Sequence, residues 1–186
     1  MLRYALPALA AAACAVIPAS ASAQAFEGEY LALQAGVSIL KTKGEVISGP
    51  LSESDTKPVV VAVAGFRGPI GENSPIVLGI EGDIGLTIDE FDSRFGVSGI
   101  AGFKAGERTL IYGRGGYLQR GGVERASGGS SVGGWMAGAG VEFAAFGDFN
   151  MRVDYRYADL GSDTDVLGFS RNFKSHELMA GAVFDF

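Results

Sequence analysis

The sequence holds few residues of the kinds that perform chemistry. Its 186 residues include one cysteine, Cys14, and one histidine, His176. Cys14 lies in an N-terminal apolar run that is predicted to be removed, which would leave no disulfide, no thiolate metal site and no cysteine nucleophile. No cofactor and no metal are therefore expected. Lipidation of Cys14 is the alternative, but residues 11–13 are alanines and lack the leucine usual before such a cysteine.

Basic residues are also in the minority. Lysine and arginine number 15 against 21 aspartates and glutamates, for a formal net charge of −6. Proteins that bind nucleic acid need a basic surface to neutralise phosphates, so nucleic acid is not expected as a partner. The solubility of exposed loops is a sufficient explanation for the mild acidity.

The first 23 residues are predicted to be a cleaved signal peptide. Arg3 supplies the positive start, and residues 4–17 form an apolar run that is too short to span a bilayer, which takes ~20 residues. Pro18 ends the run, and Ala21, Ser22 and Ala23 give the small-x-small pattern of a cleavage site. The mature chain, residues 24–186, keeps 14 basic and 21 acidic residues, a net charge of −7.

Residues 24–186 contain no run of 18 apolar residues, so no transmembrane helix is predicted. Even so, 47% of the chain is hydrophobic, and 29 glycines are scattered through it without the collagen period. Alternating strands produce a chain that is apolar overall but never locally continuous. Transmembrane barrels alternate apolar residues that face lipid with polar or small residues that face the lumen.

Alternation of apolar and polar residues predicts eight strands. They cover about residues 29–39, 59–68, 76–86, 95–104, 109–119, 133–145, 149–157 and 176–186. The seventh is the clearest: Phe149, Met151, Val153, Tyr155 and Tyr157 face outward, while Asn150, Arg152, Asp154 and Arg156 face inward. The second is the least clear, because residues 59–63 are continuously apolar and Arg67 could face either way.

The connections alternate strictly between long and short. Long ones are predicted at residues 40–58, 89–92, 120–131 and 160–173, and short ones at 71–75, 106–107 and 147–148. All long connections then lie at one end, as in bacterial barrels with short periplasmic turns and long extracellular loops. The strands also match the ~9–11 residues that a tilted membrane strand needs, and closure avoids unpaired amides in hydrocarbon. The predicted fold is an all-β, eight-stranded, antiparallel up-and-down transmembrane β-barrel.

A set of charged residues falls on the inward face. It comprises Glu81, Asp83, Arg114, Glu142, Arg152, Asp154 and Arg156, joined by Lys104, Glu177 and Asp185. An eight-stranded barrel has a lumen just wide enough for side chains to fill it, and buried charges must pair. The pattern predicts a packed polar lumen. A narrow or gated pore whose ion pairs open is the alternative.

Aromatic residues gather near the ends of the predicted strands. Tyr30, Phe95, Tyr117, Phe143, Phe149 and Tyr157 are interpreted as girdles at the two membrane interfaces. The alternative is that aromatic residues favour strands at any position. Asp159, Asp163 and Asp165 could hold a divalent cation loosely, although their spacing is not that of a calcium loop, and a solvated loop is the simpler interpretation.

Four segments resemble outer-membrane β-barrel proteins of the OmpA-like and opacity-like type, often labelled the porin family of Gram-negative surface proteins. They are residues 78–83, 134–142, 154–161 and 176–186. The resemblance implies an eight-stranded barrel, inserted by an assembly machinery that recognises a terminal aromatic residue with apolar residues at alternate positions upstream. Leu178, Ala180, Ala182, Phe184 and Phe186 fit that signal. It also implies contact with outer-membrane lipid and lipopolysaccharide, and a monomer.

The expected function is therefore an integral outer-membrane protein without catalysis, with a role in envelope integrity or surface adhesion through its four long loops. No motif names the ligand of those loops. A narrow diffusion channel is the alternative, and a lipid-modifying enzyme is a third hypothesis. Such an enzyme would need His176 beside a serine and a carboxylate, but in this register His176 faces lipid while Glu177 faces the lumen.

Overall fold

The computed structural model describes residues 26–46, 49–72, 74–88, 92–121, 131–145, 149–164 and 170–186. The predicted signal peptide and Cys14 lie outside this part of the chain. Eight strands are present: β1 (Gly28–Val46), β2 (Gly49–Pro69), β3 (Ile76–Thr87), β4 (Ser93–Lys104), β5 (Thr109–Gly121), β6 (Ser131–Ala144), β7 (Asn150–Thr164) and β8 (Ser170–Asp185). Among the described residues, no helix is long and apolar enough to cross a membrane.

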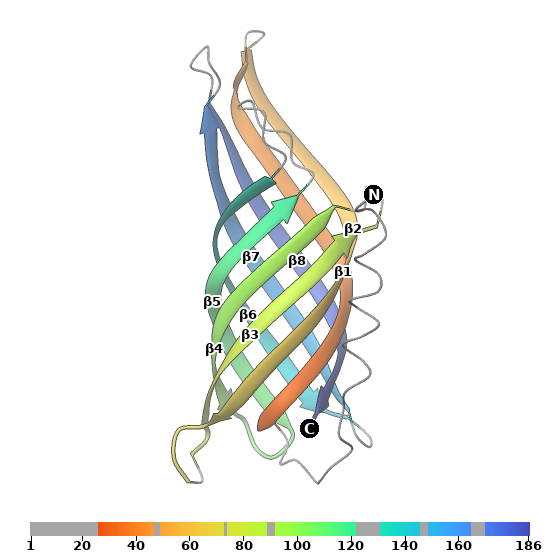
Figure 1. Ribbon diagram of the computed structural model, residues 1–186, viewed down its shortest axis with the longest axis vertical. Helices are drawn as coiled ribbons and strands as arrows, with labels where there is room; N and C mark the ends of the chain where they lie inside the picture. Colours follow the sequence, from red (N-terminus) through yellow and green to blue (C-terminus); the bar gives the residue numbers. More distant parts are fainter. Residues whose placement is uncertain are drawn as a thin grey trace, which may run out of the picture.

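Each strand pairs antiparallel with its neighbours in the sequence, and β8 pairs with β1 to close the barrel (Figure 1). The C-terminus lies at the end of the barrel where the short turns are (Figure 1). The predicted fold class is confirmed. For β3 to β6 the predicted bounds lie within two residues of the observed ones.

Two of the predicted long loops are wrong. β1 and β2 stay paired as far as Val46 and Gly49, and β7 and β8 as far as Thr164 and Ser170, so most of residues 40–58 and 160–173 is strand. The apolar alternation stops where the strands leave the apolar level, but the backbone ladder continues with polar side chains. We call residues 40–46, 49–58, 160–164 and 170–175 the raised sheet; it extends beyond the ends of β3 to β6 (Figure 1).

A β-bulge interrupts the ladder between β7 and β8 at the base of the raised sheet. The register shifts between Asp159 and Ser162, and Gly161 adopts a φ of +80°, which an L side chain would disfavour. The Gly161 amide donates a hydrogen bond to the Asp159 carboxylate at 3.2 Å. The bulge thus uses a glycine where the backbone demands one.

The two faces of the sheet meet different surroundings. On β4, Arg94, Ser98 and Ile100 are buried in the lumen while Phe95 and Val97 are each 52% exposed on the outside. The remaining strands repeat this pattern and give a continuous outer belt of apolar side chains. It includes Leu33, Val37, Phe66, Leu78, Ile80, Ile84, Ile111, Met151, Val153, Leu178 and Phe184. On β2, whose facing was left open, Val59, Val61, Val63 and Arg67 point inward.

The seam between β1 and β8 requires a glycine at position 36. A Cβ atom there would lie 2.0 Å from the Leu178 carbonyl oxygen, whereas a Cβ on the outward-facing Gly82 would meet nothing within 4 Å. Gly36→Ala is therefore expected to lower the free energy of unfolding by about 1–3 kcal/mol. Gly82→Ala should change it by less than about 0.5 kcal/mol. Urea unfolding in lipid vesicles measures both, and equal effects would contradict the close approach at the seam.

Candidate functional site

The lumen of the barrel is the most heavily charged interior surface of the described chain. Its buried charged side chains come from β2 to β8, and none is more than 6% exposed: Arg67, Glu81, Asp83, Arg94, Arg114, Arg120, Glu142, Arg152, Asp154, Arg156 and Glu177. They share inward positions of the two-residue period, which points alternate side chains to one face. Their ion pairs form a ladder along the barrel axis.

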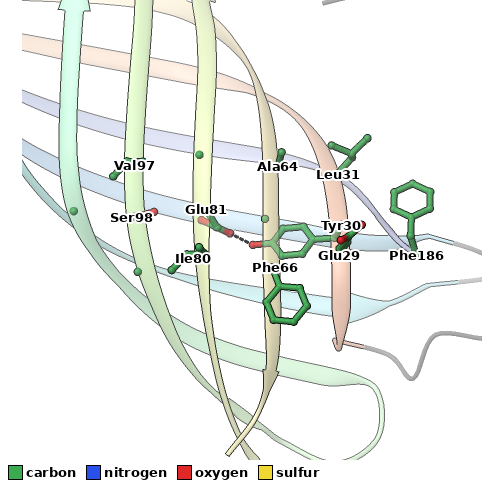
Figure 2. A pocket seen from close by; sticks show the side chains of 14 residues that line it. Glu29, Tyr30, Leu31, Ala64, Phe66, Ile80, Glu81, Val97, Ser98 and Phe186 are labelled. Atoms are coloured by element: carbon green, nitrogen blue, oxygen red, sulfur yellow. Dashed lines mark hydrogen bonds between the residues drawn. The ribbon is translucent and has the colours of Figure 1, made fainter. Parts of the chain in front are cut away.

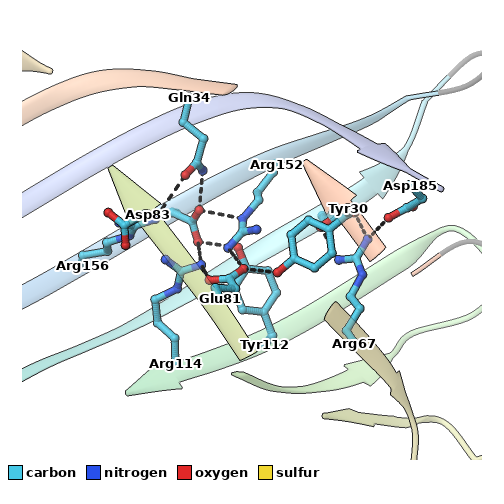
Figure 3. A network of polar contacts seen from close by, with 12 residues as sticks. Tyr30, Gln34, Arg67, Glu81, Asp83, Tyr112, Arg114, Arg152, Arg156 and Asp185 are labelled. Carbon is cyan, nitrogen blue, oxygen red and sulfur yellow. Dashed lines mark hydrogen bonds and ion pairs between the residues drawn. The ribbon is translucent and has the colours of Figure 1, made fainter. Parts of the chain in front are cut away.

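The end of the ladder near the C-terminus centres on Arg67. Its two terminal nitrogens bind the Glu142 carboxylate in a bidentate pair at 2.7 and 2.8 Å, and one of them also lies 2.5 Å from Asp185. Asn150 donates to both carboxylates, at 2.9 and 2.7 Å. The guanidinium lies 4.4 Å from the centre of the Tyr30 ring, so an aromatic face covers the group (Figure 3).

Glu81 is the central acceptor of the ladder. The Tyr30 hydroxyl donates to its Oε1 and the Arg114 guanidinium to its Oε2, and a terminal nitrogen of Arg152 forms an ion pair with Oε1 at 2.7 Å (Figure 3). All four side chains are at most 5% exposed. A buried carboxylate that accepts from a guanidinium group and a phenol and pairs with a second guanidinium group is held firmly, because its hydrogen bonds are charge-assisted.

Asp154, which shares Arg152 with Glu81, accepts hydrogen bonds from a second set of donors. Arg152 Nε donates to it at 2.8 Å, and both the Tyr112 hydroxyl and the Gln34 amide donate to the same carboxylate. Arg152 also lies over the Tyr112 ring, 4.8 Å from its centre. Arg152 therefore bridges the two central carboxylates, Glu81 and Asp154.

The end of the ladder near the raised sheet is built on Asp83 and Glu177. Arg94 joins them, donating to Asp83 at 3.0 Å and to Glu177. Arg156 lies 3.1 Å from Asp83 and donates to Gln34 at 3.2 Å, which links this group to the central one. The ladder is thus continuous along the lumen.

Arg120 caps the ladder beneath the raised sheet. It donates to Ser38 at 2.8 Å and to Ser175 at 3.1 Å, and lies 4.0 Å from the Glu177 carboxylate. Apolar groups fill the lumen between these polar levels. One contains Ala32, Val59, Val61, Val63, Met179 and Val183; a second Leu118, Val132, Met136, Leu160 and Phe173; a third Phe26, Val77, Ile100 and Leu110.

The structure brings all seven predicted residues of the lumen network together. Glu81, Asp83, Arg114, Glu142, Arg152, Asp154 and Arg156 are buried and joined to other members of the ladder. Glu177 and Asp185 also take part, whereas Lys104 pairs with Glu27 at partly exposed positions. Arg94 and Arg120 were missed because they lie just outside the predicted strands. Extending the period of two by one residue would have found them.

Five of the six predicted interfacial aromatics lie on the outer face. Phe95 and Tyr117 are near the long connections and Phe143 and Phe149 near the short turns, with exposures between 39% and 52%; Tyr157 faces out near the long connections and is partly covered. The assignment of Tyr30 is wrong. Its side chain is 1% exposed and points into the lumen, because its hydroxyl supplies a hydrogen bond that Glu81 needs.

The C-terminal residues of the proposed assembly signal also share the outer face of β8. Leu178 and Phe184 are 54% and 44% exposed, Ala180 is exposed, and Ala182 and Phe186 are partly covered. The apolar stripe that an assembly machinery would read is therefore accessible on the surface of the last strand.

His176 lies on the same outer face, in contact with aromatic residues. Its Nδ1 is 2.8 Å from the Tyr155 hydroxyl, and its ring is 5.2 Å from that of Tyr157. Ser175 and Glu177, its neighbours in the sequence, point into the lumen instead. Within the described chain, His176 therefore has no serine and carboxylate arranged for nucleophilic catalysis.

The loose cation site lies mostly outside the described residues. Asp159 accepts from the Gly161 amide and lies 3.9 Å from Lys174, while the side chains of Asp163 and Asp165 lie outside the described residues. Among the described residues no three acidic, histidine or cysteine side chains are grouped to hold a metal ion.

A hollow of about 790 Å³ lies beside the ladder, over β1 to β5 (Figure 2). Phe66, Ile80 and Val97 flank it on the outside, and Gly82 and Gly99 line it without side chains of their own. Its lining is predominantly apolar but also includes Tyr30, Glu81 and Ser98 of the lumen, so the hollow lies where the outer belt meets the ladder.

One protein family and several solved structures are similar to this chain. Among solved structures, the chain is similar to neisserial surface protein A (17% identity, TM-score 0.48, 86% of this chain and 100% of that one). It is also similar to the attachment invasion locus protein of Yersinia pestis, in complex with a heparin analogue (18%, 0.42, 85% and 99%), and to the N-terminal β-barrel domain of Pseudomonas aeruginosa OprF (10%, 0.48, 86% and 99%). No curated protein matches the chain. The sequence model of one family, the outer membrane protein β-barrel domain, matches residues 8–186, and the chain belongs to that family.

Proposed function

We propose that the protein is a non-enzymatic barrel with a closed lumen, which supports the outer membrane and presents its raised sheet to the exterior as a surface for ligands. The ladder of ion pairs carries this proposal. Ten of its eleven charged side chains are at most 5% exposed, and they hold one another across the barrel from Arg67 at one end to Glu177 at the other.

A diffusion channel is the second candidate, and the packing of the lumen weighs against it. A conducting path would have to separate Arg67 from Glu142 and Arg152 from Glu81, and would leave charges unpaired in a confined interior. It would also have to pass between the apolar groups formed around Val61, around Met136 and around Leu110.

Planar-bilayer recordings test the closed lumen. The wild-type barrel is expected to give no steady conductance above that of the empty bilayer. Arg152→Ala and Glu142→Ala should each raise the frequency of openings, because each removes a group that holds the ladder together. Steady conductance in the wild type, altered by these same substitutions, would favour the channel instead.

The raised sheet supports the role in surface recognition. β3 pairs with β2 only from Val59 onward and the Ile88 amide donates to the Pro58 carbonyl at 3.1 Å, so residues 49–56 of β2 extend beyond the end of β3 on that side. An edge of this kind presents backbone amides and carbonyls to which an extended segment of a partner can pair. The residues on its outer face, such as Ser54 and Thr56, are polar and exposed.

Cysteine labelling on intact cells tests the orientation, because the mature chain is predicted to have no cysteine of its own. Ser54→Cys on the raised sheet should react with a membrane-impermeant maleimide on whole cells. Glu107→Cys in the short turn after β4 is the matched control and should react only once the outer membrane is permeabilised. The reverse result would place the raised sheet in the periplasm and end the proposal.

A further inference from the structure

Three lysines lie beside one another on the outer face of the barrel, where β1 meets β8. Lys41 is directly opposite Lys174 in the register of these strands, and Lys43 follows two positions along β1, opposite Asn172. Opposite residues of an antiparallel pair share a face with their Cβ atoms ~4.5–5.5 Å apart, and so do residues two apart on a strand. The three ammonium groups can therefore converge on one ligand.

This lysine patch lies at the upper boundary of the apolar belt. The next opposite pair toward the short turns is Ile39 and His176, and the one after it is Val37 and Leu178, which are 44% and 54% exposed. Beside the boundary, Trp135 packs on Tyr157 at 5.4 Å and Tyr157 on His176 at 5.2 Å. Amphipathic aromatic rings occupy the head-group level of a membrane, which places the lysines at that level.

The described side chains compensate the charges of the patch poorly. Lys174 is 45% exposed and its carboxylate neighbour, Asp159, lies 3.9 Å away. Lys41 and Lys43 are exposed, and neither has an ion pair with a described side chain. Like charges directly opposite one another destabilise a sheet. A basic patch in a chain with 21 acidic and 15 basic residues therefore calls for an external anion.

We propose that Lys41, Lys43 and Lys174 bind the phosphates of a phosphorylated glycolipid, the lipid A part of lipopolysaccharide, in the outer leaflet. Lysine binds phosphate as a mobile point charge, which suits a head group that is not fixed by a pocket. The acyl chains would lie along Ile39, Val37 and Leu178, and the sugar would meet the ring of His176. The inference rests on the proposed orientation, because only that orientation brings the patch to the outer leaflet.

A lipid fits this patch better than a soluble anion. The lysines point sideways from the barrel wall, directly above apolar residues that hydrocarbon would cover, and no described element encloses them. A free phosphate would gain only the exposed charges, whose attraction salt and water screen. A glycolipid gains the same charges and buries its chains at the same time.

Binding is tested with the folded barrel in phosphatidylcholine nanodiscs, titrated with bis-phosphorylated lipid A. Trp135, the only tryptophan of the sequence, lies two strands from Lys174 and reports binding by its fluorescence. Each of Lys41→Gln, Lys43→Gln and Lys174→Gln should weaken the apparent affinity about fivefold, and the triple variant on the order of 100-fold. The control Lys104→Gln/Arg108→Gln, at the opposite end, should remain within about twofold.

Four results would overturn the inference: a triple variant that binds as the wild type does, equal binding of dephosphorylated lipid A, equal loss of affinity in the control, or saturation by inorganic phosphate alone. Gel mobility before and after boiling shows that each variant is folded, and the single variants provide graded losses. Failure of the surface labelling of Ser54→Cys would refute the proposed function. The preference for lipid A in nanodiscs does not depend on orientation, so the two failures are distinguishable.

Discussion

Glu81→Ala should lower the free energy of unfolding by about 3–5 kcal/mol, the effect expected when one partner of a buried ion pair is removed. Glu81 accepts from Tyr30 and Arg114 and pairs with Arg152 at 2.7 Å, and all four side chains are buried in the lumen. Without it, two guanidinium groups keep their charge but lose a principal counter-ion. The destabilisation arises more from these incompletely compensated buried charges than from the hydrogen bonds that are lost.

Guanidinium unfolding of barrels folded in lipid vesicles, followed by Trp135 fluorescence, measures this effect. Glu107→Ala, which removes an exposed carboxylate from a short turn, is the control and should stay within about 0.5 kcal/mol of wild type. Glu81→Gln keeps the shape but not the charge and should fall between the two. Equal stabilities of Glu81→Ala and Glu107→Ala would mean that the ladder is solvated and not packed.

A double-mutant cycle separates the pair from its surroundings. Arg152→Ala alone should also destabilise, because Glu81 loses an ion-pair partner and Asp154 loses a hydrogen-bond donor. The double variant should cost less than the sum of the two single ones, since each substitution removes the group that the other leaves unpaired. Simple additivity would contradict a direct interaction between Glu81 and Arg152.

The alternation of the sequence was sufficient to predict the barrel, because each strand passes between two different environments. On β7, Arg152 and Asp154 face the lumen and Val153 and Tyr155 face outward, as the pattern indicates. The same rule located the predicted charge network. A period of two with one polar and one apolar side has no other simple explanation in strands of this length.

The rule fails where the two environments become alike. In the raised sheet both faces of the strands carry polar residues, such as Thr42 and Ser54. The sequence there resembles a loop, although the backbone pairing of β1 with β2 continues. On β2 the lumen side is itself apolar, with Val61 and Val63 packed inside, so the alternation disappears. Tyr30 is misplaced for a related reason, since an aromatic ring with a hydroxyl suits an interface and a polar lumen equally.

The sequence alone could not predict which charged residues of the lumen pair with one another. Arg67 and Glu142 are 75 positions apart, and they meet only because the tilt and stagger of the closed barrel bring β2 and β6 to the same level across the lumen. Alternation predicts whether a side chain faces the lumen or lipid. It does not predict the position of a residue along the barrel axis relative to residues on the opposite side of the lumen, which depends on the register of every strand between them.

Val153→Arg tests most directly whether the outer face of the barrel contacts lipid. Val153 is opposite Val141 on one side and Ala180 on the other, and lies halfway between the outward-facing Phe149 and Tyr157. This is the level of the membrane centre, where a basic side chain on the lipid face costs about 2–4 kcal/mol. Gln119→Arg, at an outward position beyond Tyr117, should cost at most about 1 kcal/mol, because the penalty falls toward the interfaces.

Unfolding in vesicles and in detergent separates the causes of such a loss. If hydrocarbon is responsible, the difference between Val153→Arg and Gln119→Arg should shrink in detergent, where a charge reaches water more easily. An unchanged difference would indicate a packing defect instead, and no difference in vesicles would mean that this face does not contact lipid. Arg152 and Val153 are adjacent in the sequence, but Arg152 faces the polar lumen and Val153 faces lipid. Removing the charge of Arg152 and adding a charge at Val153 should therefore both destabilise the barrel.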